Sequence, residues 1–219
     1  MTTLLAPLLL SVAAALPGAD KTGTFPGAQD GFMYRLQSLC DGRAYAGRLV
    51  STDEADAEMA AQPMVMHASE CVIRNGKLTQ IKIPFQVGED RSRTWVVTRL
   101  GSGVRLKHRH RHEDGTDDAL TMYGGHSAGD GTFTRQDFPA DEESKEMFEA
   151  GGIPQSSANV WAVEMAPGDR FAYEMTRPGR MFRVEFDLSR SVEYPGPAWG
   201  EADRGEVSED PPARGWSRY

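Results

Sequence analysis

Short stretches of alternating hydrophobic and polar residues dominate this chain, and turn residues separate them. Such alternation places every second side chain on one face and is typical of a half-buried β-strand. In residues 77–87, for example, Thr79, Ile81, Ile83 and Phe85 share one face. The pattern predicts about ten strands, at residues 42–52, 63–74, 77–87, 93–100, 104–112, 118–125, 131–138, 159–165, 170–176 and 181–189.

Tight turns connect most of these strands, among them Asn75-Gly76 and Gly101-Ser102-Gly103. Consecutive hairpins build an antiparallel sheet, and a sheet of about ten twisted strands curls towards closure, which removes its exposed edges. The sequence therefore predicts an all-β fold, an antiparallel up-and-down β-barrel that is lipocalin-like in architecture. A two-sheet β-sandwich is the alternative.

Two helices interrupt the strand pattern. A short N-terminal helix is expected at residues 31–40, with Asp30 as its N-cap, and an interior helix at 141–152, capped by Asp141. We expect a single barrel domain over residues 21–190. Residues 191–219 are rich in Pro, Gly and charge, which is typical of a mobile tail.

The N-terminus carries a targeting pattern. The apolar run Leu4–Leu16 is too short to span a bilayer, and small residues suited to signal cleavage end it. Residues 1–20 are therefore predicted to be a signal peptide, and the protein to be exported, either periplasmic or secreted. No later apolar run predicts a transmembrane anchor.

The two cysteines fit an exported protein. Cys40 and Cys71 are predicted to form a disulfide that ties the N-terminal segment to the sheet; two buried free thiols are the alternative. The net charge of −8 argues against general nucleic-acid binding, which favours a basic surface.

Three of the five histidines lie on one predicted strand, residues 104–112. His108, His110 and His112 continue the apolar face of that strand, which we expect to point into the barrel. Basic residues fill the opposite face. If the preceding turn has two residues, Trp95 falls opposite His108; a three-residue turn would instead place Trp95 opposite Arg109. The predicted ligand-binding residues are His108, His110, His112, Trp95 and Arg93.

The same histidines are candidate metal ligands. Residues i and i+2 of a strand lie roughly 6.6 Å apart, so two neighbouring imidazoles can share an ion if another segment adds a ligand. Third-ligand candidates include His67 and Asp114. The predicted metal set is His108, His110, His126 and Glu113, and the expected ion is a zinc-like divalent metal.

The segment Gly125–Gly129 matches the G-x-S-x-G motif of serine hydrolases, with Ser127 at the nucleophile's position. That motif functions between a buried parallel strand and a helix, whereas the flanking residues here predict a hairpin loop. We therefore interpret the segment as a loop.

The stretches PFQVGEDRSRTW, LKHRHRHEDG, TMYGGHSAGDGTFTRQDFPAD and RPGRMFRVEFDL resemble uncharacterised exported bacterial proteins of unknown function. The resemblance covers about residues 40–190 and implies a bacterial, exported origin without indicating a mechanism. Three functions remain open: a barrel that binds a small-molecule ligand, a metal-dependent hydrolase or lyase, and an envelope-associated structural or interaction protein. The sequence does not indicate an oligomeric state.

Overall fold

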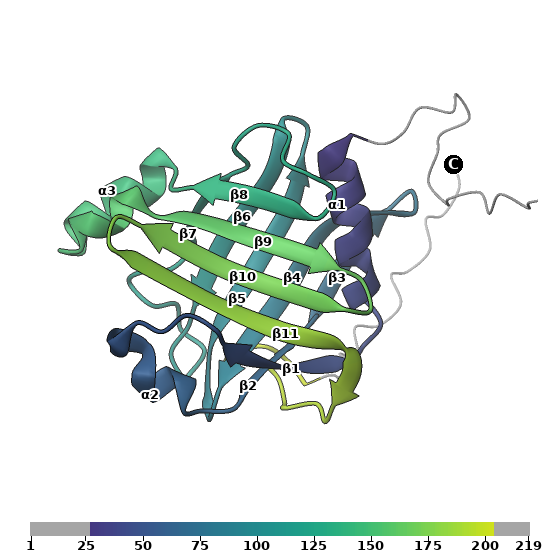
Figure 1. Ribbon diagram of the computed structural model, residues 1–219, viewed down its shortest axis with the longest axis horizontal. Coiled ribbons are helices and arrows are strands. Elements are labelled where there is room, and N and C mark those ends of the chain that lie inside the picture. The colour runs from purple at the N-terminus through teal and green to yellow at the C-terminus, as the bar shows by residue number, and fades with distance from the viewer. Residues whose placement is uncertain (1–26, 204–219) are drawn as a thin grey trace, which may run out of the picture.

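The computed structural model describes residues 27–203. Their strands form an antiparallel sheet that curls into a nearly closed ten-strand barrel (Figure 1). The strands are β1 (Ala44–Leu49), β2 (Met64–His67), β3 (Glu70–Arg74), β4 (Lys77–Val87), β5 (Asp90–Leu100), β6 (Gly103–His110), β7 (Tyr123–His126), β8 (Arg135–Pro139), β9 (Val160–Ala166), β10 (Arg170–Arg177) and β11 (Arg180–Val192). Their order is β7-β6-β5-β4-β2-β1-β11-β10-β9-β8, with β3 paired to β4 off this path. The predicted up-and-down barrel is thus confirmed, rather than the two-sheet sandwich.

Hydrogen bonds beside β7 and β8 bring the two ends of the sheet together. The Ala128 N–H donates to the Asp137 carbonyl at 2.8 Å, and the Asp141 N–H donates to the Gly124 carbonyl at 2.9 Å. Gly125 makes this approach possible, because a Cβ atom there would lie 1.8 Å from the Pro139 oxygen. Both strands are shorter than predicted, since loops occupy residues 118–122 and 131–134.

The predicted strand at residues 63–74 is divided into β2 and β3. β3 pairs with β4 as far as Lys82, and β2 pairs with β4 from Phe85 onward. Pro84 lies between these two pairings. Because proline has no N–H to donate, it fits the point where β4 changes partner.

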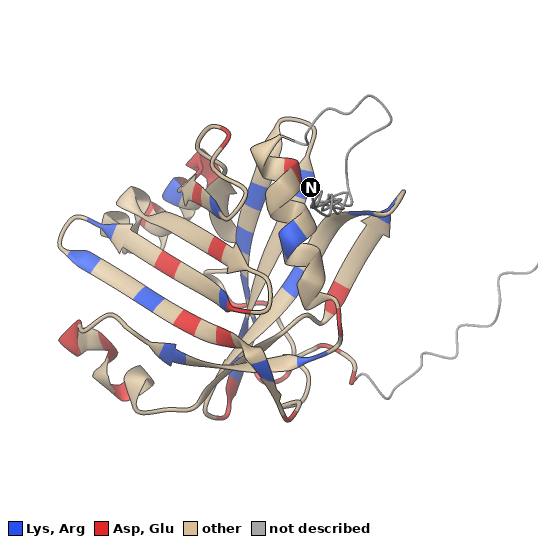
Figure 2. Cartoon of the chain, turned by 45° about the vertical axis from the view of Figure 1, so that its right-hand side comes forward, with Lys and Arg blue, Asp and Glu red and all other residues tan. Residues whose placement is uncertain are grey.

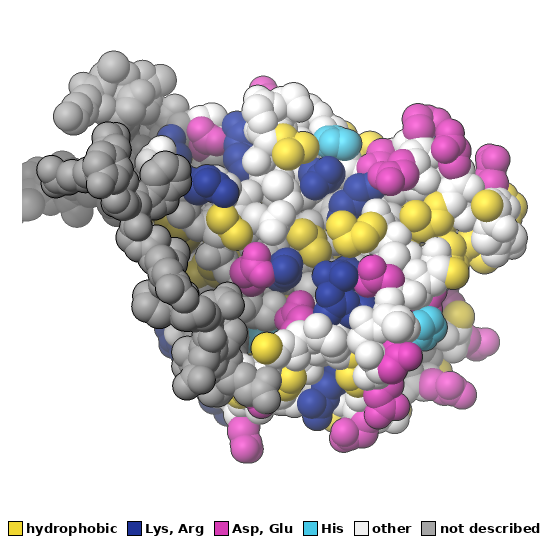
Figure 3. Space-filling view, turned by 180° about the vertical axis from the view of Figure 1, so that it is seen from behind, with side chains coloured by type: hydrophobic (Ala, Val, Ile, Leu, Met, Phe, Trp, Pro, Cys, Tyr) yellow, Lys and Arg dark blue, Asp and Glu magenta, His cyan; other side chains and the backbone are white. Residues whose placement is uncertain are grey.

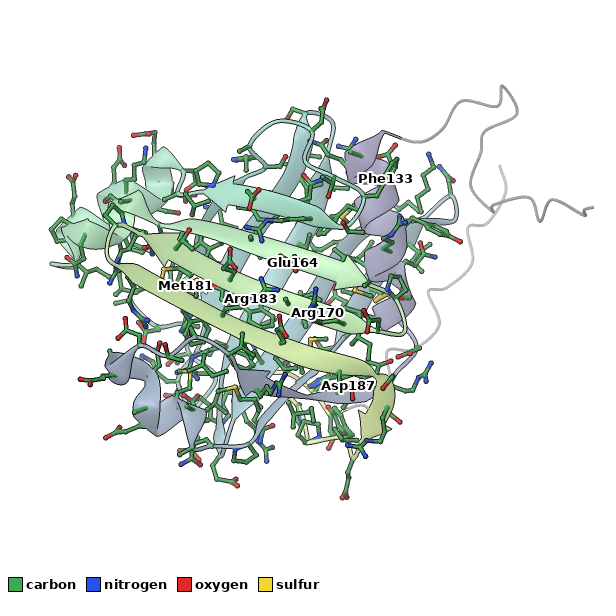
Figure 4. The ribbon with its side chains drawn as sticks, in the orientation of Figure 1. Phe133, Glu164, Arg170, Met181, Arg183 and Asp187 are labelled. Atoms are coloured by element: carbon green, nitrogen blue, oxygen red, sulfur yellow. A yellow bond between two sulfur atoms is a disulfide. The ribbon has the colours of Figure 1, made fainter. Side chains whose placement is uncertain are left out.

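Side chains alternate between the two faces of β9, β10 and β11, the strands nearest the viewer in Figure 1. Trp161, Val163 and Met165 of β9 point into the core, and each is at most 2% exposed. The outer face carries charged residues, which appear as blue and red bands in Figure 2. Arg183 of β11 pairs with Glu164 of β9 at 2.8 Å across the intervening strand β10, and both residues are labelled in Figure 4.

Helix α1 (Ala28–Leu36) covers one end of the barrel, on the right in Figure 1. Phe32 and Leu36 are fully buried there. The helix begins three residues earlier than predicted, with Gly27 as its N-cap. Asp30 is therefore not the cap; it lies in the first turn and pairs with Arg99 of β5 at 2.8 Å. A 3₁₀ turn, η1 (Gln37–Leu39), follows.

Helical segments surround the opposite end of the barrel (Figure 1). They are η2 (Glu54–Asp56), α2 (Ala57–Ala60), α3 (Glu142–Ala150) and η3 (Pro154–Ala158). The predicted cap of α3 is confirmed, because the Asp141 carboxylate accepts the Ser144 N–H at 3.0 Å. The sequence pattern did not predict η2, α2 or η3.

The segment after β11 lies against the barrel. Within the predicted tail, β11 continues to Val192, and the Trp199 N–H donates to the Arg91 carbonyl at 3.1 Å. The predicted signal peptide (1–20) and residues 204–219 of the predicted tail lie outside the described residues. Between residues 27 and 203, no helix has the length and apolar character needed to cross a membrane.

The predicted disulfide is present: Cys40, directly after η1, is bonded to Cys71 of β3 across a separation of 31 residues. Closing a loop of that length restricts the unfolded chain. We expect Cys40→Ser/Cys71→Ser to lower the free energy of unfolding by about 4 kcal/mol. Urea denaturation of the variant and of the oxidised wild type measures the difference. Equal unfolding midpoints with equal slopes would show that the bridge does not stabilise this fold.

Candidate ligand-binding site

A cavity of about 460 Å³ occupies the end of the barrel opposite α1. Its walls come from β4, β5, β6, β7, β9, β10 and β11, while Asp56 of η2, Met59 of α2, Phe148 of α3 and Ser156 of η3 also line it. Because α1 fills the other end, the barrel has the form of a cup with one opening.

His108 lies on the inner face of β6, opposite Trp95 of β5, and is only 4% exposed. Its Nδ1 lies 3.2 Å from the Tyr123 carbonyl oxygen, and its Nε2 lies 2.7 Å from the Tyr173 hydroxyl. A carbonyl oxygen can only accept, so Nδ1 carries the proton and Nε2 accepts the Tyr173 O–H. Both ring nitrogens of the neutral imidazole therefore have partners.

His110 lies nearer the opening on the same face of β6. Its Nε2 is 3.0 Å from the Tyr123 hydroxyl, and Arg93 of β5 is its cross-strand neighbour. Tyr123 thus contacts both histidines, through its carbonyl oxygen and its hydroxyl. The inward direction predicted for this face of the strand is confirmed for His108 and His110, which both line the cavity.

Burial keeps these groups neutral. It lowers the pKa of His108 to about 3, and the neighbouring His110 contributes to the shift. Burial also lowers the pKa of His110 to about 4, with a further contribution from the Arg93 charge. The pKa of Tyr123 is raised to about 12 by burial, and burial raises that of Tyr173 well above its ordinary value. The polar groups of the cavity wall therefore act as hydrogen-bonding groups at neutral pH.

Aromatic rings form most of the wall. Trp95 stacks between Phe85 and Tyr173, with ring centroids 4.9 Å and 4.5 Å away. Tyr123 stacks on His108 at 4.8 Å, and Trp161 packs beside His108 at 4.9 Å. These contacts hold the rings in fixed orientations around the cavity.

Three arginines line the opening. Arg93 pairs with Asp90 at 2.6 Å, and Arg180 pairs with Asp56 at 2.5 Å. Arg177 differs, because its described partners are the neutral oxygens of two polar side chains. These partners are Ser156 Oγ at 3.2 Å and Asn159 Oδ1 at 3.3 Å.

Four of the five predicted ligand-binding residues line the cavity: His108, His110, Trp95 and Arg93. His112 lies beyond the end of β6 on an exposed loop.

The four predicted metal ligands do not converge. His126 is exposed on the outer face of β7, where its Nδ1 is 4.0 Å from Asp141, and Glu113 is exposed on the loop after β6. Asp114 follows on the same loop, and His67 of β2 packs edge-on against Tyr194. Within the part of the chain that the structure describes, no three His, Cys, Asp or Glu side chains gather closely enough for a metal ion.

The turn between β5 and β6 has two residues, because Leu100 pairs with Gly103 and Trp95 with His108. Carboxylates neutralise much of the basic outer face of this hairpin, which belongs to the surface seen from behind in Figure 3. Lys107 pairs with Asp141 at 2.9 Å, and Arg109 pairs with Asp117 at 3.1 Å.

Ser127 has a structural position. It follows β7, and its hydroxyl accepts the Val104 N–H at 3.2 Å and the Gln29 amide at 3.1 Å. The G-x-S-x-G segment thus begins in the last two residues of β7 and continues into the loop before β8, so a strand rather than a helix follows it.

The cavity residues that were not predicted include Tyr123, Tyr173, Trp161 and Arg177. The alternation in β10 contains a signal for two of them, because Phe171, Tyr173, Met175 and Arg177 fall on one face. No local pattern brings that face opposite β6, since residues 108 and 173 are 65 positions apart.

Fold and cavity together define the class of protein: a nearly closed up-and-down β-barrel with a helix at one end and a cavity of about 460 Å³ at the other. The chain matched no protein-family model, and comparison with curated proteins and with solved structures also gave no match.

Loss of the Tyr173 hydroxyl would leave His108 Nε2 buried without its partner. We expect Tyr173→Phe to lower the free energy of unfolding by about 1–3 kcal/mol, the usual cost of an unsatisfied buried group. Tyr34→Phe is the matched control, because Tyr34 is 52% exposed and should change stability little. Urea denaturation compares the two variants. Equal effects would mean that the His108–Tyr173 bond adds no stability.

The lowered pKa values of His108 and His110 predict a pH dependence. Their ordinary value in the unfolded chain is about 6.5, so the unfolded state binds more protons below that pH. The stability from keeping both rings neutral is complete above about pH 6.5 and is lost as the pH falls towards 4 and 3.

NMR titration of the histidine ring signals tests this expectation. In the native protein, the signals of His108 and His110 should stay unchanged from pH 8 down to about pH 5; in denaturing urea they should titrate near 6.5. A native midpoint near 6.5 for either ring would contradict the burial argument.

Proposed function

We propose that this protein is an exported β-barrel that binds a small molecule in its His-lined interior. The observation that carries the proposal is the cavity of about 460 Å³, where a few polar groups converge within aromatic walls. Ligand sites are commonly 300–1,000 Å³ in volume and combine apolar walls with a small number of orienting polar groups.

The rigidity of the wall supports this function. His108 is held from two sides by Tyr123 and Tyr173, and Trp95 is held within a stack of three rings. A wall that is already ordered loses little entropy when a ligand binds, so more of the contact energy becomes affinity.

Export is supported by two features. The apolar run Leu4–Leu16 has the length of the hydrophobic region of a signal peptide, and the Cys40–Cys71 disulfide is typical of oxidising compartments.

The geometry favours binding over the metal-dependent hydrolase or lyase. Both ring nitrogens of His108 already have partners, so it has no lone pair free for an ion. An envelope-associated role through the basic hairpin is also less favoured, because Lys107 and Arg109 are already paired with carboxylates.

Filling the cavity provides the test. Ile153 lies on the rim of the cavity, and a larger side chain there should occupy space that the ligand needs. Protein purified from its native host would be extracted with organic solvent, and mass spectrometry would identify compounds present in stoichiometric amounts. We expect such a compound with the wild type and at least a tenfold loss in Ile153→Trp, which corresponds to about 1.4 kcal/mol of binding energy.

Ile73→Trp is the matched control, because Ile73 is 47% exposed on β3 and is not part of the cavity lining. It should retain the compound. Equal retention by both variants would place binding outside the cavity, and the absence of a bound compound from every sample would contradict the proposal.

A further inference from the structure

Arg177 differs from the other two arginines of the cavity in its partners. Arg93 and Arg180 each have a carboxylate within 2.6 Å, whereas the Arg177 Nη1 contacts Ser156 Oγ and Asn159 Oδ1. Among the described residues, no carboxylate lies within ion-pair distance of Arg177. Its charge is therefore uncompensated at the edge of a cavity lined largely by aromatic rings.

The Arg177 guanidinium also has hydrogen-bonding capacity to spare. Guanidinium groups carry five N–H donors in a planar fork that matches a carboxylate. Both described contacts of Arg177 use Nη1, so the Nε and Nη2 donors have no described protein acceptor. Ser156 and Asn159 are each 7% exposed, and they hold Nη1 in place while the remaining donors stay free.

The charges elsewhere on the lining give an anion a preferred orientation. Asp118 lies on the loop between β6 and β7, beside His110, and its carboxylate accepts the Leu120 N–H at 2.8 Å. An anionic group is repelled there and attracted at Arg177. The neutral histidines add no charge to the wall.

The aromatic side chains of the remaining wall favour a ligand with a flat, unsaturated ring system. Trp95, Trp161, Tyr123, Tyr173 and Phe182 line the same cavity as Arg177. Aromatic rings attract other rings through stacked and edge-to-face contacts in addition to the hydrophobic effect.

From these observations we infer that the ligand is an aromatic monoanion, with its carboxylate or similar group bound by Arg177 and its rings between the aromatic side chains. This inference rests on the proposed function and specifies the chemical class of its ligand.

Three probes separate charge from ring character: 2-naphthoate, its neutral analogue 2-naphthylmethanol, and the aliphatic anion decanoate. Isothermal titration calorimetry would measure each with the wild type and with Arg177→Gln. We expect the wild type to bind 2-naphthoate most tightly. Arg177→Gln should weaken 2-naphthoate binding about 10- to 100-fold and leave 2-naphthylmethanol unchanged.

Two further variants sharpen the result. Arg74→Gln removes the same charge from the exposed end of β3, away from the cavity, and should bind all three probes as the wild type does. Arg177→Lys keeps the charge without the planar fork and should recover only part of the 2-naphthoate affinity. Unchanged binding of 2-naphthylmethanol shows that each variant is folded.

The outcomes are distinct. Equal wild-type affinity for 2-naphthoate and 2-naphthylmethanol, or equal weakening of both by Arg177→Gln, overturns the anion inference but leaves a binding barrel. If the wild type binds decanoate as tightly as 2-naphthoate, the inference that the ligand is aromatic is overturned. Failure of all three probes to bind overturns the inference as a whole, while the solvent-extraction experiment separately decides whether the barrel binds a ligand.

Discussion

The hydrogen bonds beside β7 and β8 join the two ends of the sheet, and the cavity depends on that closure. The Ala128 and Asp141 N–H groups bridge the seam, and Gly125 allows the close approach. Without the seam, two strands would expose edges, and the inner faces of β6 and β10 would not lie across from one another.

Burial of polar groups constrains the interior further. A histidine inside a barrel is costly unless both ring nitrogens have partners, because an unsatisfied polar atom loses its hydration without compensation. Tyr123 and Tyr173 supply those partners for His108, and they come from two different strands. The same network fixes the tautomer, while burial keeps His108 neutral, so the ring contributes shape and hydrogen bonding without adding charge.

Arg177 differs from Arg183 on the outer face of the sheet in the charge of its partners. On the outside, Arg183 pairs with Glu164, Glu174 and Glu185, all within 2.9 Å. The opening of the cavity instead holds Arg177, whose described partners are neutral. Most of the cations on the described surface are paired with carboxylates. An arginine without a carboxylate partner beside a cavity therefore marks a place where an external anion can complete the pairing.

The sequence by itself determined the features that depend on neighbours along the chain. Alternation predicted most strands, Asp141 predicted the start of α3, and the spacing of His108 and His110 predicted that both share one face. Only the tertiary structure decided which residues meet across the barrel. The length of the β5–β6 turn selected the Trp95–His108 pairing. Closure of the barrel brought Tyr173 and Arg177 of β10 to the cavity that Trp95 and His108 also line. The physical reason is range: the two-residue period of a strand is local, whereas register and closure depend on the packing of the whole sheet.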